Sequence, residues 1–168
     1  AAMIDPYKTE LDAKMNKVIG ILTTTLEKAR PQSTLGNWMC DVIHERAQHY
    51  YGKHVDFAHQ NYGGIRINNI SAGDITTRNI YELMPFDNKI VIVELQGDII
   101  LKMINHLASN GGRPFSGSLN MKVDKDGSPT DIMIAGKPID LSKTYIMALP
   151  DYVANGGGGC DFLKPLKQ

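Results

Sequence analysis

The sequence predicts an α+β fold in which a mixed β-sheet packs against helices. Apolar residues recur at helical spacing mainly in the early part of the chain, whereas short β-branched runs separated by turn residues predominate later. The two kinds of segment also alternate in places, which is typical of a sheet with strands in both directions. With 168 residues and 42% hydrophobic content, the chain can bury a globular core.

The first helical pattern covers residues 7–28, where apolar residues recur with a helical period and predict one amphipathic helix. Pro31 stops that pattern. Ser33 and Thr34 then offer hydroxyl groups that can cap a second helix, which we expect to run to about residue 51. Gly52 follows as a suitable C-terminal stop for that helix.

Shorter elements follow in the order strand, helix, strand, helix and then three strands. We expect them at residues 55–58, 77–84, 89–95, 97–110, 118–123, 131–134 and 144–149. The run from residue 89 to residue 95 is nearly continuous in β-branched residues, which is the pattern of a buried strand. The turns at Gly127 and Gly136 are hairpin signals between the late strands.

The composition favours some classes of protein over others. Eighteen Lys and Arg residues balance 18 Asp and Glu residues, and this zero net charge argues against nucleic acid as the main partner. No segment approaches the roughly 20 apolar residues that span a bilayer. The chain does not begin with a secretory signal, although a mature exported protein would have lost one. Cys40 and Cys160 could be bridged, free or buried, and we favour two buried thiols.

Three loops carry residue types that suit a ligand. In the first, Gly63 and Gly64 let the backbone turn sharply and approach a ligand, and Arg66 can present a planar, charged fork to phosphate. In the second, Phe86 lies between a proline and a turn. The third, residues 150–159, ends in four consecutive glycines that are entropically costly to order.

Each loop also has a purely structural interpretation. A Gly-Gly turn with a solvated arginine, a phenylalanine in the core and a plain flexible turn would produce the same three patterns. By composition alone, these loops therefore do not establish a site.

Taken together, the loops match a family. The ordered segments are Asn61-x-Gly63-Gly64-Ile65-Arg66, Gly73-Asp74-Ile75-Thr76, Pro85-Phe86 and Asn155-Gly156-Gly157, with Leu35-Gly36-Asn37, Asp41, Gly97 and Ser116-Gly117 at matching places. This set resembles the C-terminal domain of the 5'-nucleotidase and UDP-sugar hydrolase family. The resemblance covers roughly residues 30–162, so we expect residues 30–168 to form that domain and residues 1–29 to be an N-terminal helix that links or docks a partner.

The resemblance implies a site that binds the nucleoside part of a substrate. Phe86 and Tyr152 would sandwich the base, which stacks on aromatic rings with little preference among bases. Asn61 would hydrogen-bond the base or shape its loop, and Arg66 would hold phosphate or ribose oxygens. Gly63, Gly64 and Asn155 complete the motifs that form this site.

Two positions depart from the family pattern. The family carries a second arginine seven residues before the glycine of Leu-Gly-Asn, where this chain has Ala29, and Arg30 is the nearest arginine that could take its role. The family's ribose-binding aspartate directly follows Asn-Gly-Gly, where this chain has Gly158. Asp161 is the nearest carboxylate that could replace it. Without such a carboxylate, recognition of the ribose hydroxyls would be weakened or lost.

Catalytic residues are not expected in this chain. Full-length relatives carry a separate metallophosphoesterase domain with Asp-x-His, Gly-Asn-His and His-x-His motifs for two divalent metals, and none of these motifs occurs here. The chain alone should therefore bind, without a metal or other cofactor of its own, and a separate metallophosphoesterase domain or chain should hydrolyse. The alternative is a stand-alone module that binds nucleotides or related phosphate ligands without catalysis. The resemblance also implies a role in nucleotide catabolism and a periplasmic or other exported location.

Overall fold

The structure is a computed structural model that describes residues 5–166. At its centre lies a three-stranded sheet in the order β3 (Phe57–Ala58), β10 (Thr144–Pro150) and β6 (Ile90–Gln96). β10 runs parallel to β3 and antiparallel to β6, so this sheet is mixed, as the sequence predicts.

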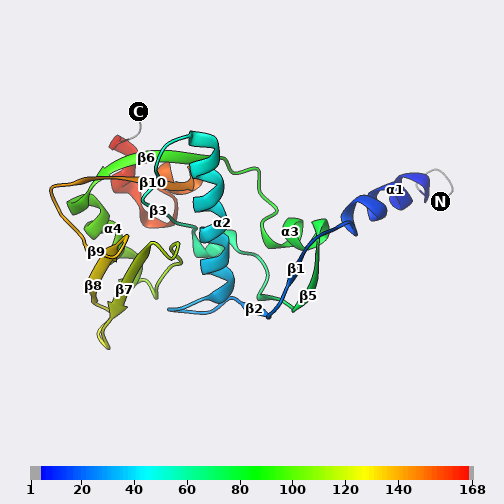
Figure 1. The fold of residues 1–168 in the computed structure, drawn as a ribbon, viewed down its shortest axis with the longest axis horizontal. Helices are drawn as coiled ribbons and strands as arrows, with labels where there is room; N and C mark the ends of the chain where they lie inside the picture. Colours follow the sequence, from blue (N-terminus) through cyan, green and yellow to red (C-terminus); the bar gives the residue numbers. More distant parts are fainter. Residues whose placement is uncertain (1–4, 167–168) are drawn as a thin grey trace.

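Helices cover both faces of the central sheet (Figure 1). α2 (Thr34–Tyr51) packs on one face and α4 (Gly97–Ser109) on the other. Side chains of β10 alternate between the two faces, as in any strand: Met147 belongs to the core under α4, and Ala148 belongs to the core under α2. The predicted α+β fold with helices packed on a mixed sheet is therefore confirmed.

β6 is an edge strand, and the prediction of a buried strand is wrong for most of it. Only Leu95 is buried along β6, and Ile90 is 40% exposed. β10 pairs with one side of β6, and no strand within residues 5–166 pairs with its other side. The apolar run instead reflects contact with two cores, since Val91 and Val93 pack against one core and Ile92 packs against the other.

The predicted helix boundaries after residue 30 are close to those observed. Ser33 caps α2, because its Oγ accepts a hydrogen bond from the Gly36 N–H at 2.9 Å. Gly52 ends α2 in the left-handed region, with φ 68°, where glycine has no steric penalty. α3 (Thr77–Leu83) begins at a capping box in which Thr76 is the N-cap residue.

The prediction of one helix over residues 7–28 is wrong beyond its first part. α1 (Asp5–Met15) is helical, but β1 (Val18–Leu22) follows and pairs antiparallel with β5 (Gly73–Thr76). β1 is rich in β-branched residues and has Gly20 at its centre, both of which disfavour a helix. The apolar spacing of this segment fits both the period of a helix and that of a strand. Pairing with β5 makes it a strand.

The segment after β1 is also part of the sheet structure. β2 (Leu26–Glu27) pairs antiparallel with β4 (Asn69–Ile70). α1, in contrast, projects away from the body of the molecule (Figure 1). An ion pair between Asp12 and Arg78, with 3.0 Å between Oδ1 and Nη2, ties α1 to α3.

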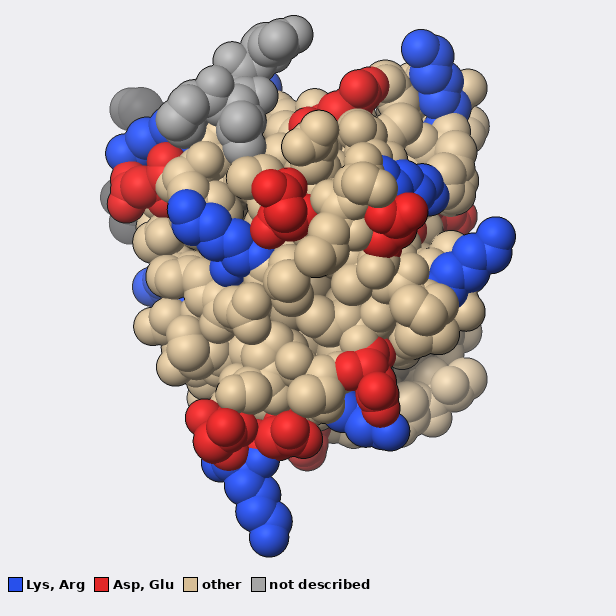
Figure 2. Space-filling view, turned by 90° about the vertical axis from the view of Figure 1, so that its left-hand side faces the viewer, with Lys and Arg blue, Asp and Glu red and all other residues tan. Residues whose placement is uncertain are grey.

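The late strands form a separate antiparallel sheet in the order β7 (Leu119–Val123), β8 (Pro129–Ile134) and β9 (Lys137–Pro138). Its two turns use Gly127 and Gly136 at φ 86° and 73°, as the predicted hairpins require. The side of the molecule that carries this sheet and α4 is shown in Figure 2, where basic and acidic side chains are interspersed around a large uncharged area.

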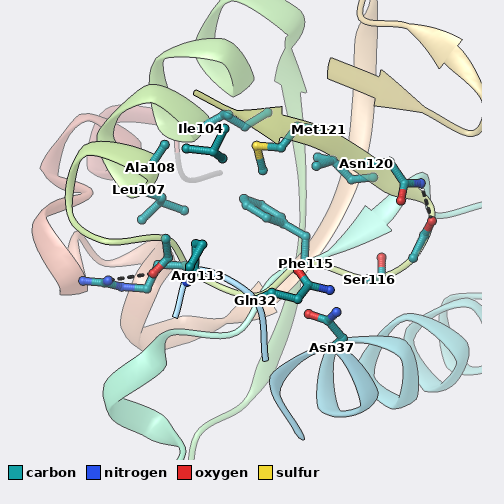
Figure 3. A pocket seen from close by; sticks show the side chains of 15 residues that line it. Gln32, Asn37, Ile104, Leu107, Ala108, Arg113, Phe115, Ser116, Asn120 and Met121 are labelled. Carbon is teal, nitrogen blue, oxygen red and sulfur yellow. Dashed lines mark hydrogen bonds between the residues drawn. The ribbon is translucent and has the colours of Figure 1, made fainter. Parts of the chain in front are cut away.

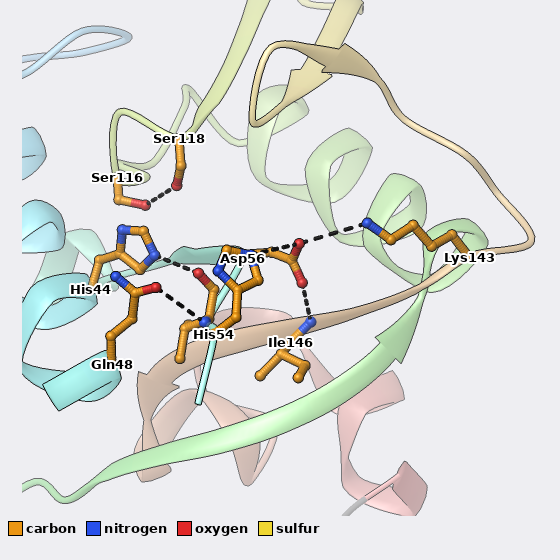
Figure 4. A network of polar contacts seen from close by, with 9 residues as sticks. His44, Gln48, His54, Asp56, Ser116, Ser118, Lys143 and Ile146 are labelled. Atoms are coloured by element: carbon orange, nitrogen blue, oxygen red, sulfur yellow. Dashed lines mark hydrogen bonds and ion pairs between the residues drawn. The ribbon is translucent and has the colours of Figure 1, made fainter. Parts of the chain in front are cut away.

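A polar network fixes the start of β3 next to β10 (Figure 4). Asp56 is buried, and its Oδ2 accepts a hydrogen bond from the Ile146 N–H at 2.7 Å. Its Oδ1 lies 3.4 Å from His54 Nε2 and 3.8 Å from Lys143 Nζ. The buried carboxylate therefore has a backbone hydrogen-bond donor and a cationic partner, Lys143, which offset the cost of its burial.

Both cysteines are free and buried, as favoured from the sequence. Cys40 lies in α2, and Cys160 belongs to the core under α4. Burial raises the pKa of both thiols, so each stays protonated near neutral pH and acts as a small apolar side chain.

His59 makes the stability of the fold dependent on pH. Its ring is buried, its Nδ1 lies 2.9 Å from the Pro114 carbonyl oxygen, and burial lowers its pKa from 6.5 to about 4. The folded chain therefore holds His59 neutral where an unfolded chain would protonate it. The resulting stability is fully present above pH 6.5, and we expect it to fall by about 3 kcal/mol as the pH decreases toward 4.

Urea denaturation at a series of pH values measures this effect. His59→Asn keeps an N–H group that can donate to Pro114 but does not titrate, so it should show a weaker pH dependence between pH 4 and 6.5 than the wild-type chain. His49→Asn, at an exposed position of α2, is the matched control and should follow the wild type. Parallel pH profiles for wild type and His59→Asn would contradict the assignment.

Candidate ligand-binding site

Three loops meet at one end of the central sheet. β3 and β10 are parallel, so their carboxyl ends lie together. β6 runs the other way and begins at the same end, because Pro150, the last residue of β10, pairs with Ile90. Residues 61–66 after β3, residues 86–88 before β6, and α5 (Asp151–Ala154) after β10 therefore adjoin one another.

A cavity of about 310 Å³ lies where these loops meet. Its lining consists of Asn61, Gly63, Gly64, Arg66, Phe86, Asn88 and Tyr152. The structure thus brings together six residues that the resemblance assigns to the site, from three distant parts of the chain. Asn88 is the seventh, and sequence reasoning missed it. The available signal was an amide two residues after the aromatic in the same loop.

Phe86 and Tyr152 present rings to the cavity. Their exposed fractions are 45% and 49%, so Phe86 is not the core residue that its composition also allowed. Gly157 lies directly against the Tyr152 ring, and a Cβ at that position would collide with it. Gly157, one of the four consecutive glycines, therefore leaves room for the Tyr152 ring beside the cavity. In that position the ring is available for stacking.

Arg66 supplies a cation beside the aromatic wall. Its backbone N–H donates to the Leu83 carbonyl at 2.8 Å, which anchors the residue, and its guanidinium carbon lies 5.7 Å from the centre of the Phe86 ring. Arg66 is exposed, and no ion pair within residues 5–166 includes it. Its Nη1 donates to the Gly63 carbonyl at 3.5 Å, and its remaining N–H donors are available to an anion.

Further cations gather around Tyr62, next to the glycines of the first loop. The Arg30 guanidinium carbon lies 3.9 Å from the centre of the Tyr62 ring, and Lys28 Nζ lies 4.2 Å from it. The Arg113 guanidinium carbon lies at 6.0 Å. Lys28, Tyr62 and Arg113 were not identified from the sequence, because nothing in the sequence brings three distant segments together.

Three residues assigned by the resemblance do not line the cavity. Arg30 lies over Tyr62 instead. Asn155 follows α5, and its backbone N–H donates back to that helix at 2.9 Å. Asp161 is exposed and forms an ion pair with Lys164, which lowers the pKa of its carboxyl. In this arrangement the carboxylate of Asp161 is paired with Lys164 and does not line the cavity.

A second cavity, of about 280 Å³, lies between α4, β7 and the segment before α2 (Figure 3). Side chains such as Leu107 and Phe115 form an apolar wall, and the amides of Gln32 and Asn37 lie at its other side. Arg113 lines this cavity too, and its Nη1 donates to the Gly112 carbonyl at 2.9 Å. Arg113 therefore belongs both to this cavity and to the group of cations around Tyr62.

The fold is an α+β domain, and the first cavity at the end of its sheet is a candidate small-ligand site. Comparisons with known proteins make the class specific. The 5'-nucleotidase, C-terminal domain family matches residues 16–165. Protein UshA of Escherichia coli is 31% identical over 167 residues, which cover 94% of this chain and 29% of UshA. Rat 5'-nucleotidase is 26% identical over 96% of this chain and 32% of its own length.

Solved structures indicate the same family. The 5'-nucleotidase precursor from Thermus thermophilus superposes with a TM-score of 0.80 at 29% identity, over 96% of this chain and 34% of that protein. The chain therefore belongs to the 5'-nucleotidase C-terminal domain family. It spans about a third of the length of these relatives.

The described part of the chain contains neither a metal-binding cluster nor a membrane-spanning helix. Within residues 5–166, no group of three or more His, Cys, Asp or Glu side chains is placed to hold a metal ion. No helix in the same range is long and apolar enough to cross a bilayer.

Proposed function

We propose that this chain is the nucleotide-binding part of a 5'-nucleotidase-type phosphohydrolase that acts in nucleotide catabolism. One observation carries the proposal: Phe86, Tyr152 and Arg66 line the same cavity although they come from three separate loops. Two half-exposed rings suit a flat base, and a guanidinium beside them suits a phosphate. Family membership supports this assignment.

Each part of the cavity has a distinct role in this proposal. Phe86 and Tyr152 stack on the base, and we expect them to accept different bases because every base has a π-face. The amides of Asn61 and Asn88 offer a donor and an acceptor each to the polar edge of the base. Gly64 packs directly against the Gln60 side chain, where a Cβ would collide, and the absence of side chains at Gly63 and Gly64 would let the backbone of the first loop approach the ligand.

The hydrolytic chemistry belongs to another part of the enzyme in this proposal. A metallophosphoesterase domain or chain would supply a pair of divalent metals that activates water and stabilises charge at phosphorus. α1, which projects from the body of the molecule, would link or dock that partner, whereas β1 and β2 are paired within the domain. We also propose a periplasmic or other exported location, which the resemblance to this family implies. Cell fractionation with an antibody would test it, and recovery in the cytosol alone would contradict it.

A second candidate function is binding without catalysis. The glycine at position 158, where the family has its ribose-binding aspartate, favours this alternative. Gene neighbourhood discriminates the two, since an adjacent metallophosphoesterase reading frame would support the enzyme.

A calorimetric panel tests the proposed site directly. We expect a nucleoside monophosphate to bind with micromolar to millimolar affinity, the matching nucleoside to bind more weakly because it lacks the contact with Arg66, and ribose 5-phosphate to bind most weakly because it lacks the base. Equal affinity for all three ligands, or no binding of the nucleoside, would contradict a base pocket beside an anion contact.

Position 158 offers a gain-of-function test of the ribose contact. Gly158 has φ 68°, and a Cβ there would meet no atom within 4 Å, so Gly158→Asp has room and Asp tolerates this backbone region better than most residues. We expect Gly158→Asp to strengthen binding of a ribonucleotide by about threefold to tenfold but not binding of its 2',3'-dideoxy analogue. Gly158→Ala is the matched control, and an equal gain for both ligands would contradict a ribose contact.

A further inference from the structure

Tyr62 occupies the unspecified position of the Asn61-x-Gly63 motif, and three cations converge on its ring. Arg30 lies 3.9 Å, Lys28 4.2 Å and Arg113 6.0 Å from the ring centre. The three cations come from segments up to 85 positions apart, as residue numbers 28 and 113 show. Cations within about 6 Å of an aromatic centre are attracted by the negative face of the ring.

No carboxylate in the described part of the chain pairs with these charges. Within residues 5–166, no ion pair includes Lys28, Arg30 or Arg113. Their hydrogen bonds go to backbone carbonyls instead: Lys28 Nζ donates to Ile65 at 2.6 Å, and Arg30 Nη1 donates to Asn110 at 3.2 Å. Carbonyl oxygens fix the positions of these cations without cancelling their charge.

The cations also repel one another. Burial, followed by the charges of Arg66 and Arg30, lowers the pKa of Lys28. Burial and the charge of Arg30 likewise lower the pKa of Arg113. A group of adjacent positive charges without an acidic partner is unfavourable in the free protein, and a bound anion would relieve the repulsion.

We propose that Tyr62 is a positioning residue whose ring holds Lys28, Arg30 and Arg113 as a preassembled subsite for the phosphate group of the ligand. This inference rests on the proposed function, since the ligand it completes is a nucleotide whose base lies in the Phe86–Tyr152 cavity. A ring holds cations without neutralising them, whereas an acidic residue at position 62 would itself compete with the phosphate. Lys28 Nζ donates to the carbonyl of Ile65, which directly precedes Arg66, so the subsite adjoins the Arg66 side of the aromatic cavity.

Calorimetry with paired ligands tests the role of Tyr62. The readout is the ratio of the affinities for a nucleoside monophosphate and its parent nucleoside. We expect Tyr62→Leu to reduce this ratio by between about twofold and thirtyfold with unchanged nucleoside affinity. Tyr62→Phe keeps the ring and should keep the ratio. An unchanged ratio in Tyr62→Leu would overturn the proposal, and so would an equal loss for both ligands, because that outcome indicates a collapsed loop.

Variants of the cations provide an independent test if Tyr62→Leu does not fold. Lys28→Met and Arg113→Met should each reduce the same ratio and leave nucleoside binding unchanged, and added salt should diminish the difference. If both variants retain the wild-type ratio, the subsite does not exist. Retention of the wild-type ratio by both variants overturns this inference alone, because Arg66 could still supply the anion contact of the proposed function. A wild-type chain that binds neither ligand overturns the proposed function and the inference with it.

Discussion

Phe86→Ala is expected to weaken the binding of a nucleoside monophosphate by between about fivefold and a hundredfold, since stacking contributes roughly 1–3 kcal/mol per base. The side chain is 45% exposed, so its removal leaves no large void in the core and the fold should be retained. Titration calorimetry measures the loss, and thermal unfolding checks that stability is unchanged.

Tyr152→Ala should produce a loss of the same size, because the Tyr152 ring lines the same cavity. Tyr152→Phe keeps the stacking surface and should bind as the wild type does, which tests whether the hydroxyl matters. Tyr50→Ala is the matched control, because Tyr50 is a 77% exposed tyrosine on α2 that does not line this cavity. Identical affinities for wild type, Phe86→Ala and Tyr152→Ala would exclude a base sandwich.

Much of the fold is encoded locally, which is why the sequence predicts it well. The boundaries of α2 depend on a serine cap and a glycine stop that lie next to the helix they delimit. β10 and α4 likewise follow from patterns within their own segments. The path of residues 16–28 is different, because the strand partner that decides it lies about fifty residues further along the chain.

The candidate site divides in the same way. Ordered motifs identify Asn61, Arg66, Phe86 and Tyr152, and strand order explains why they meet. Two of the cations around Tyr62, Lys28 and Arg113, lie outside every motif. Their convergence depends on how the chain before α2 and the loop after α4 fold back on the first loop, as the positions of Arg30 and Arg113 show. Contacts of this kind follow from tertiary packing and cannot be read from spacing along the sequence.

The isolated chain is expected to release no phosphate from a nucleoside monophosphate, even with added Mg²⁺, Mn²⁺ or Zn²⁺. Joining a metallophosphoesterase domain ahead of residue 1, or supplying it as a separate chain, should raise the rate at least about a thousandfold over the chain alone, because the metal pair provides the nucleophile and stabilises charge at phosphorus. A colorimetric phosphate assay measures both rates. Robust metal-dependent turnover by the isolated chain would contradict the proposal that this chain binds the nucleotide and a separate metallophosphoesterase domain or chain hydrolyses it.

Variants of this chain show whether such activity uses the candidate site. In the reconstituted enzyme, Phe86→Ala should lower kcat/KM by about the factor by which it weakens binding, since the base contact would be present in both the ground state and the transition state. Tyr50→Ala should leave kcat/KM unchanged. If the metallophosphoesterase domain alone hydrolyses the nucleotide as fast as the mixture and Phe86→Ala has no effect, this chain does not present the substrate, and the stand-alone binding module becomes the better interpretation.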